Sequence, residues 1–335
     1  MERLNRLTLI LGGPRSGTTW LSKIFDSHPD VLYRHEPDLV VIDEVVPHIC
    51  PAGGEAAFVA ATRTYFRDLL DLRTLKTAGS LPVFPKNYES APLRLARQAS
   101  IGALRAIRGV LPVATVNRWP VPERFDPARQ ADIHYVIKSV ASLGRAGLLA
   151  QALPEARIIL ILRNPLGQVA SRLRGLKDGR LERRERDLAL LETEQARRFG
   201  LTEQRLLSCS EAEYLAWEWA VLNHKAAEEL DGLPQARSLR HADLVREPLA
   251  QSRALFAFAG LSWQPATEEF IRLSTSHDGP EGYFQVMRDA SKVLDNWRTQ
   301  LTQAQQEEIR AVVAATPLAR RWPELFPAAG TAHAA

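Results

Sequence analysis

Residues 12–20, GGPRSGTTW, combine glycines, hydroxyl side chains and one arginine in a pattern suited to binding an anion. Residues 7–11, LTLIL, suit a strand buried on both faces, and apolar residues at near-helical spacing follow from Trp20 to Phe25. A strand would therefore lead through a tight loop into a helix. The first N–H groups of such a helix have no partner within it and can bind an anion. The candidate ligands of a phosphate or sulfate group are Arg15, Ser16, Gly17, Thr18 and Thr19.

The separation of Gly12 and Gly17 matches the phosphate-binding loop of ATP and GTP enzymes, G-x-x-x-x-G-K-[ST]. However, Thr18 stands where those enzymes have the lysine that reaches the terminal phosphates. The loop therefore lacks the main charge for binding a nucleoside triphosphate. A P-loop kinase that phosphorylates a small molecule with ATP remains one alternative, and a glycine-rich turn without a ligand is another.

A second group of candidate ligands follows the apolar run at residues 158–162. Arg163 stands at the carboxyl end of this predicted strand, and Pro165 suits the first turn of the next helix, on which Ser171 follows. Open parallel sheets bind ligands at the carboxyl ends of their strands. We therefore expect Arg163 to point into the same crevice as the loop at 12–17.

A candidate proton acceptor lies just beyond the first predicted helix. The apolar residues 31–33 deliver His35 and Glu36, and either side chain could act as a general base toward a hydroxyl or amine. A surface carboxylate or a helix cap is the alternative interpretation of Glu36. The residues alone leave the choice between the two bases open.

The run PRSGTTWL, followed by SHPDV, resembles the 5′-phosphosulfate loop of sulfotransferases that use 3′-phosphoadenosine 5′-phosphosulfate (PAPS). The resemblance implies that the loop holds the 5′-phosphate and sulfuryl group of PAPS. It implies that Glu36 is the catalytic base, and that Lys138, at the end of IHYVIKSV, stabilises the transition state and leaving group together with Arg15. It also implies that Arg163 and Ser171, eight residues apart, bind the 3′-phosphate. Trp20 would stack on the adenine, with a core position as the alternative.

Two later segments resemble the same family more weakly. HADL at 241–244 is similar to a family strand end that reads Tyr-Glu-Asp-Leu, which implies that His241 contacts the adenine or ribose. RDASKVLDNWR at 288–298 looks like the C-terminal loop that closes on the 3′-phosphate. Its candidate ligands are Arg288, Ser291 and Lys292.

The resemblance predicts a sulfotransferase that moves a sulfuryl group from PAPS to an acceptor hydroxyl and releases adenosine 3′,5′-bisphosphate (PAP). The segment around Glu36 favours a carbohydrate acceptor, with lipid, peptide or small-metabolite acceptors also open. We expect no metal requirement, because a sulfuryl group carries less charge than a terminal phosphoryl group and no metal-ligand spacing is evident. A non-catalytic nucleotide-binding protein is the alternative from a different functional class.

These residues require an α/β fold of three layers, similar to P-loop proteins, with a central parallel sheet flanked by helices. We predict a single domain over residues 1–330 and a disordered tail at 331–335. Residues 38–132 are rich in alanine, arginine and leucine and are broken by prolines. They suggest a helical insertion between the first and second sheet strands that forms a cap on the acceptor side. Its arginines at 94, 97, 105 and 108 could meet an acidic acceptor or form a solvated stripe.

Composition places few further limits on function. The chain has 335 residues with 43 basic and 39 acidic side chains, so its formal charge is only +4. The basic residues are mixed with acids, and we predict no nucleic-acid partner. The two cysteines, Cys50 and Cys209, provide no disulfide framework. Because no signal peptide or membrane-spanning run is evident, we expect a cytoplasmic protein, and its oligomeric state is not predicted.

Overall fold

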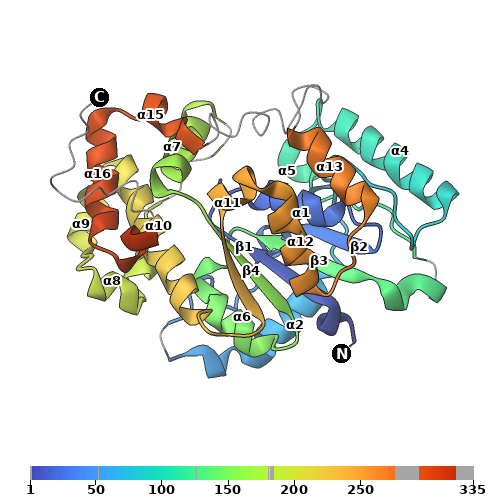
Figure 1. Ribbon diagram of the computed structural model, residues 1–335, viewed down its shortest axis with the longest axis horizontal. Coiled ribbons are helices and arrows are strands. Elements are labelled where there is room, and N and C mark those ends of the chain that lie inside the picture. Colours follow the sequence, from blue (N-terminus) through green and yellow to red (C-terminus); the bar gives the residue numbers. More distant parts are fainter. Residues whose placement is uncertain are drawn as a thin grey trace.

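Parallel strands form the centre of the computed structural model of this chain (Figure 1). The structure describes residues 2–275, apart from 52, 126, 180 and 182–184, and residues 294–321. Within these ranges a single five-stranded sheet has the order β2-β3-β1-β4-β5, and all four strand pairings are parallel. The strands are β1 (Leu7–Leu11), β2 (Val31–His35), β3 (His134–Ser139), β4 (Arg157–Leu162) and β5 (Ala236–Arg240).

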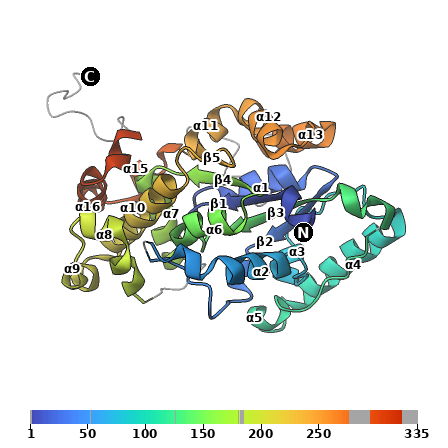
Figure 2. The ribbon, with the colours of Figure 1, turned by 90° about the horizontal axis from the view of Figure 1, so that it is seen from below.

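Helices cover both faces of the sheet, as Figure 2 shows edge-on. On one face lie α1 (Thr18–Asp26), α12 (Pro248–Ala259) and α13 (Pro265–Thr275), and on the other lie α2 (Val59–Leu69), α6 (Ala146–Ala152) and α10 (Glu211–Glu229). Alternate strand residues therefore enter two different cores: Leu9 packs in the α2 core, whereas Ile10 packs in the α1 core. This arrangement confirms the predicted three-layer α/β fold.

The remaining helices are shorter or lie away from the sheet. The α-helices are α3 (Leu75–Ala78), α4 (Ala91–Ile107), α5 (Val113–Val116), α7 (Pro165–Lys177), α8 (Glu194–Arg198), α9 (Glu203–Ser208), α11 (His241–Arg246), α15 (Trp297–Gln300) and α16 (Gln303–Ala314). The 3-10 helices are η1 (Glu2–Arg6), η2 (Pro37–Leu39), η3 (Glu55–Ala57), η4 (Pro127–Asp132), η5 (Leu143–Arg145), η6 (Leu188–Glu192) and η8 (Pro317–Arg321).

Helix α7, which carries Ser171, starts where the sequence predicts. Asn164 is its N-cap, and the side-chain oxygen of Asn164 accepts hydrogen bonds from the amides of Leu166 (2.9 Å) and Gly167. Pro165 occupies the first turn, where the missing N–H has no cost. The cap fixes the point at which the chain leaves β4, and so fixes the position of Arg163 relative to the helix.

The helical segment that the sequence places between the first two strands lies instead between β2 and β3. The prediction was wrong on this point because residues 31–35 are themselves an edge strand, paired only with β3 within the described sheet. A short strand with one partner gives little periodic signal of its own. Helices α2 to α5 therefore join the edge strand of the sheet to its neighbour.

Buried ion pairs and hydrogen bonds attach this segment to α1 and to strand β2. Lys23 and Lys86 both bind Asp26, with Nζ–carboxylate distances of 2.7 and 3.0 Å, and Lys23 also donates to the carbonyl of Ser80. Arg34 on β2 donates to both carboxylate oxygens of Glu123, at 2.9 and 2.7 Å. These charges are almost fully buried, so each requires its partner to remain in place.

Three of the four predicted arginines do not form a solvated stripe, and a contact with an acidic acceptor stays a prediction. Arg97 is buried and pairs with Glu89, Arg105 donates to the carbonyl of Gly79 at 2.8 Å, and Arg108 contacts Asn117. They face the protein rather than solvent, because the loops around α4 supply oxygen acceptors on that side. No helix among the described residues combines the length and the apolar character needed to cross a membrane.

Candidate active site

Sheet order and register bring the chemistry-bearing residues to one edge of the sheet. The central strand β1 has β3 on one side and β4 on the other. Lys138 is in register with Ile10 on β1 and with His35 on β2, and Arg163 directly follows β4. The carboxyl ends of all these strands meet here. This is the position at which open α/β sheets bind ligands.

The loop after β1 has the geometry of an anion-binding turn. The amide of Ser16 donates to the carbonyl of Gly13 at 3.1 Å, and Gly17, with φ of 97°, precedes α1 without a side-chain cap. The first-turn amides of α1 are therefore available to a ligand. Ser16 Oγ is buried, and it has no hydrogen-bond partner in the described part of the chain. An unpaired buried hydroxyl is costly, and a phosphate oxygen that accepts its hydrogen would remove this cost.

Arg15 and Glu36 have strained backbones. They are the two non-glycine residues with positive φ in the described ranges, at 70° for Arg15 and 49° for Glu36. Such conformations are uncommon for residues with a Cβ, and they persist where surrounding structure enforces them, often at functional sites. Both strained residues belong to the predicted catalytic set, although the sequence gives no signal of their backbone conformation.

His241 packs directly against the loop. A Cβ at Gly17 would lie 2.3 Å from His241 Cδ2, so this position requires glycine. His241 is 1% exposed, and neither ring nitrogen has a partner among the residues described. Burial lowers the pKa of His241 well below its ordinary value, and Arg163 lowers it further, so the ring is neutral. A neutral imidazole offers one donor and one acceptor. Its contact with adenine or ribose stays a prediction.

The second predicted motif contacts the first. Arg15 Nε donates to Ser171 Oγ at 3.0 Å, and Arg163 Nη1 donates to the carbonyl of Arg15 at 2.8 Å. Two stretches of sequence separated by about 150 residues are thus joined by hydrogen bonds at the sheet edge. The structure brings together Arg15, Arg163 and Ser171, as the shared crevice requires.

Arg174 is a further member of this cluster that sequence reasoning missed. It lines a small cavity of about 40 Å³ together with Arg15 and Ser171. Burial, together with repulsion from Arg15 and Arg174, lowers the pKa of the Arg163 guanidinium to about 10. The three neighbouring guanidinium groups create a positive potential, which an anion would relieve. The helical spacing of Ser171 and Arg174, three residues apart, was the available signal.

The predicted base lies in a second charged cluster, on the other side of the loop. The Glu36 carboxylate forms an ion pair with Lys138 through Oε1. Its other oxygen, Oε2, lies 3.4 Å from Lys76 Nζ and 3.8 Å from His35 Nε2. The structure therefore brings together Glu36, Lys138 and His35, which the sequence had selected, and adds Lys76.

Lys76 comes from α3, in the helical segment between β2 and β3. Sequence reasoning missed it because no family motif covers that segment and one lysine among many basic residues gives no signal. Its Nζ is held near Glu36 because α3 packs on β2 and is fixed by two backbone bonds. The amide of Leu75 donates to the carbonyl of Trp119 at 2.8 Å, and the amide of Lys76 donates to the carbonyl of Asn117 at 3.1 Å.

Asp38 fixes the chain just after Glu36. Its Oδ2 accepts hydrogen bonds from Ser139 Oγ at 2.5 Å, Ser142 Oγ at 2.9 Å and Arg145 Nη2 at 3.1 Å. The side chain is fully buried, so these bonds compensate for the desolvation of its charge. This network ties the strained residue 36 to the end of β3, and thereby to Lys138.

The ion pairs set the protonation of the cluster. Burial alone would raise the pKa of Glu36, but the Lys138 ammonium outweighs it, with help from His35 and Lys76, and the pKa falls to about 2. Burial, reinforced by Lys138, lowers the pKa of His35 to about 3. At neutral pH the cluster therefore contains an ionised Glu36 and a neutral His35, whose Nδ1 is 2.7 Å from the Tyr33 hydroxyl.

The low pKa of Glu36 predicts a contribution to acid stability. Its folded-state pKa of about 2 lies below the ordinary value of 4.5. The ionised carboxylate therefore stabilises the fold above pH 4.5, and this stabilisation is lost as the pH falls toward 2. At 1.36 kcal/mol per pKa unit, we expect a loss of about 2 kcal/mol from this group between pH 6 and pH 3.

Urea unfolding at stepped pH would measure this loss. The free energy of unfolding of Glu36→Gln should fall by about 2 kcal/mol less than that of the wild type over the same interval. Equal pH slopes for the two proteins would show that Glu36 has no depressed pKa in the folded state.

Three further groups of predicted residues remain: Trp20, the two threonines of the loop, and the C-terminal candidates. Trp20 is 2% exposed within the core, and its Nε1 donates to Ser274 Oγ at 3.1 Å, so the structure places it in the alternative core position. Thr18 and Thr19 form the first turn of α1, at the predicted loop. Arg288, Ser291 and Lys292 lie outside the described residues.

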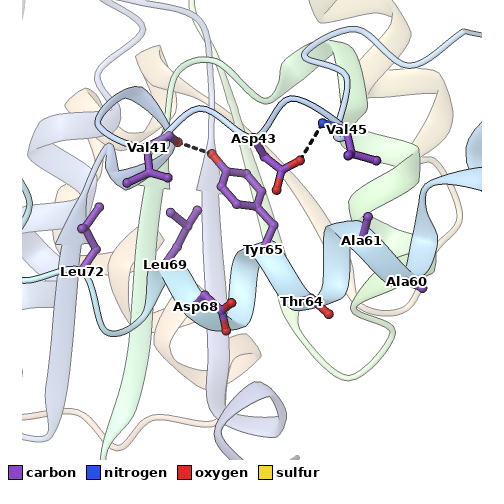
Figure 3. Close-up of a pocket in the computed structure, with 10 residues that line it drawn as sticks. All are labelled: Val41, Asp43, Val45, Ala60, Ala61, Thr64, Tyr65, Asp68, Leu69 and Leu72. Carbon is purple, nitrogen blue, oxygen red and sulfur yellow. Dashed lines mark hydrogen bonds between the residues drawn. The ribbon is translucent and has the colours of Figure 1, made fainter.

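A larger cavity lies beside this site rather than within it. It has a volume of about 610 Å³ and opens between the segment that follows Glu36 and helix α2 (Figure 3). Val41, Val45 and Leu69 supply apolar walls, with Asp43 and Asp68 at its side. Tyr65 spans it and donates to the carbonyl of Val41 at 2.6 Å. None of the predicted donor-binding residues lines this cavity.

Among the described residues, no group of three or more histidine, cysteine or carboxylate side chains is arranged to hold a metal ion. The clusters at the sheet edge instead consist of cations, hydroxyls, amides and one paired carboxylate. Such a set of donors suits an anionic ligand of two separated charges, one near the loop and one near Arg163.

Comparison with known proteins gives a consistent family. A family model described as "Sulfotransferase family" matches residues 8–265. Carbohydrate sulfotransferase 1 of Danio rerio is 22% identical over 320 residues, covering 88% of this chain and 72% of the relative. Carbohydrate sulfotransferase 5 of Homo sapiens is 26% identical over 312 residues, covering 87% and 71%.

Solved structures give weaker likenesses. The sulfotransferase domain from the Synechococcus PCC 7002 olefin synthase has a TM-score of 0.45 at 17% identity and covers 92% of this chain and 93% of that domain. Mouse sulfotransferase SULT7A1 complexed with PAP has a TM-score of 0.42 at 11% identity, and the match covers 97% of this chain and 85% of the mouse protein's chain.

Proposed function

Because this chain belongs to the sulfotransferase family, we propose that it transfers a sulfuryl group from PAPS to a hydroxyl group of a carbohydrate acceptor. The observation that carries the choice of donor is the pair of contacts that join the loop to the second motif, Arg15 to Ser171 and Arg163 to Arg15. One ligand with two anionic groups would bind at the loop and at the second motif together. PAPS and PAP carry a 5′ group and a 3′-phosphate on one ribose.

The residues at the sheet edge suit this donor. The loop amides and the hydroxyls of Ser16, Thr18 and Thr19 would hold the 5′-phosphate and sulfuryl oxygens. Arg163 and Ser171 would hold the 3′-phosphate, with Arg174 adding positive potential. The neutral ring of His241 lies against the loop, where an adenosine would extend. The unpaired buried Ser16 hydroxyl and the repelling arginines are independent signs that an anion fits here.

The proposed reaction forms a bond between the acceptor oxygen and sulfur and breaks the bond between sulfur and the bridging oxygen of the phosphosulfate, leaving PAP. Glu36 takes the proton of the acceptor hydroxyl. Lys138 stabilises the charge that develops on the sulfuryl and departing phosphate oxygens, with Arg15 and the loop amides.

The ion pair between Glu36 and Lys138 has a consequence for the timing of this reaction. A carboxylate with a pKa of about 2 is a weak base while Lys138 neutralises it. When Lys138 interacts with sulfuryl oxygens instead, the cation nearest to Glu36 is paired with another anion. The pKa of Glu36 then rises. The base would thus become effective only with the donor in place, which would limit loss of the sulfuryl group to water.

The carbohydrate acceptor is supported by the relatives, which are named carbohydrate sulfotransferases. A hydroxyl acceptor also agrees with the presence of a carboxylate base. The fold itself does not distinguish a carbohydrate hydroxyl from one on a lipid or small metabolite, so acceptor screening must separate these classes.

Calorimetry tests the donor first. We expect PAP to bind at least about tenfold more tightly than AMP, because one further phosphate meets charged donors. Incubation with ³⁵S-labelled PAPS and fractionated glycans, lipids and small hydroxyl compounds should then label the glycan fraction. If PAP binds no better than AMP, PAPS is not the donor. Turnover of ATP with magnesium in place of PAPS would favour the kinase alternative.

A further inference from the structure

Exposed apolar side chains concentrate at one end of α4. Val110 is 86% exposed, Val113 53%, Leu111 43% and Ile107 37%. These four residues, here called the apolar tip, are close in sequence, and the amides of Val110 and Leu111 both donate to the carbonyl of Ile107 at 2.9 Å. In Figures 1 and 2, α4 runs along the outer edge of the molecule, on the opposite side from α10 and α16.

The outward face of α4 continues this surface. Leu95 is 68% exposed, and the exposed positions at helical spacing from it are Ala99, Gly102, Ala103 and Ala106. Arg97 and Arg105 face inward beside Ile101 and bind groups of the neighbouring loops, whereas Gln98 is exposed. A surface helix normally buries its apolar stripe and exposes its charges. Helix α4 does bury Ile101, but it also turns Arg97 inward and leaves Leu95 exposed next to the apolar tip, and an exposed apolar surface of this kind marks an interaction site.

The charged residues of the segment around α4 are all basic. Residues 91–122 contain five arginines and no acidic residue, so the rest of the chain has 38 basic and 39 acidic side chains. The whole positive excess of the protein therefore lies on the segment that also carries the apolar tip. Arg97 pairs with Glu89. The structure shows no ion pair to a described carboxylate for Arg94, Arg105, Arg108 or Arg118.

The segment is part of the folded body. Ile101, Val116 and Val121 pack with Leu75 of α3 in a small core, and backbone bonds join α3 to Asn117 and Trp119. The apolar tip is thus held in a fixed conformation, and its exposure is not relieved by internal packing.

We propose that the apolar tip and the outward face of α4 bind the surface of an anionic lipid bilayer. Aliphatic side chains would enter the boundary between headgroups and acyl chains, while Arg94 and Arg118, which have no ion pair to a described carboxylate, meet lipid phosphates. The charge distribution favours a bilayer over a second copy of this chain, because a symmetric contact would bring two sets of uncompensated arginines together. This binding is separate from the proposed sulfuryl transfer and can be measured without an acceptor.

Vesicle flotation tests the proposal with the full chain. Wild-type protein should float with phosphatidylcholine vesicles that contain phosphatidylglycerol, less with phosphatidylcholine alone, and less at high salt. Val110→Glu/Leu111→Glu should lower the bound fraction at least about tenfold, since it places two charges at the interface. Leu207→Glu is the matched control, because Leu207 on α9 is 54% exposed and far from α4 in sequence. It should bind like the wild type.

Thermal unfolding would confirm that both variants fold. The double variant Arg94→Gln/Arg118→Gln is a second probe, which should weaken vesicle binding and reduce the salt dependence of that binding. The proposal is overturned if the wild type binds neither vesicle, or if the tip variant and the Leu207 control lose binding equally. It is also overturned if the tip variant instead abolishes a dimer seen by light scattering, since the face would then bind a second copy.

Discussion

Glu36→Gln is expected to lower kcat by about 10²- to 10⁴-fold while PAP still binds. Glutamine has nearly the shape of glutamate but cannot accept the proton of an acceptor hydroxyl. The carboxylate lies between Lys138 and Lys76 at the carboxyl edge of the sheet. The measurement is single-turnover transfer from labelled PAPS, with PAP affinity determined by calorimetry on the same preparation.

The same substitution also affects stability, and this effect must be separated from chemistry. Lys138 is buried and forms an ion pair with Glu36, so a neutral partner leaves a buried cation without its counter-charge. Breaking such a pair typically costs about 3–5 kcal/mol. We therefore expect a lower unfolding temperature together with retained PAP binding. Lys76→Met is the matched control, because it removes the other cation next to Glu36 and leaves both the base and Lys138 in place.

His35→Gln separates the two candidate bases. His35 is neutral and its Nδ1 is already engaged with the Tyr33 hydroxyl, so we expect a much smaller loss of kcat than for Glu36→Gln. If His35→Gln is inactive and Glu36→Gln retains activity, the proton acceptor is the histidine. If Glu36→Gln turns over at the wild-type rate, the proposed role of the carboxylate is wrong.

The sequence was sufficient for the parts of the site that depend on local pattern. Glycine spacing and the apolar run at 7–11 predict the strand, loop and helix that the structure contains, because backbone conformation there is set by neighbouring residues. The ends of β3 and β4 were predicted in the same way, and with them the positions of Lys138 and Arg163. Parallel strands then bring these residues to one edge without further information.

Contacts between distant segments could not be predicted in this way. Nothing in the sequence indicates that Arg15 donates to Ser171, that Lys76 lies 3.4 Å from Glu36, or that Asp38 binds Ser139. Each depends on how a connection between strands folds back over the sheet. The helical segment shows the same limit: α4 has a clear helical pattern, but the side on which its arginines lie is decided by carbonyl and carboxylate groups of other loops.

Arg163→Met is expected to weaken PAP binding by about 10- to 100-fold and AMP binding much less. Arg163 is half-buried beside Arg15 and Arg174, and the resulting repulsion is relieved when a phosphate binds among the three guanidinium groups. Methionine keeps much of the side-chain volume but removes the charge and its donors. Calorimetric titration of both nucleotides into both proteins measures the two affinities under identical conditions.

The four affinities form a thermodynamic cycle in which one change is the side chain and the other is the 3′-phosphate. Arg163 also donates to the carbonyl of Arg15, so its loss could disturb the loop and weaken every nucleotide. That effect is common to PAP and AMP and cancels in the cycle, whereas a direct contact with the 3′-phosphate does not.

Arg172→Met is the matched control, because Arg172 follows Ser171 on α7 but pairs with Glu218. It should leave the ratio of the two affinities unchanged. An equal loss for PAP and AMP in Arg163→Met would restrict Arg163 to ordering the loop and would remove the proposed 3′-phosphate site.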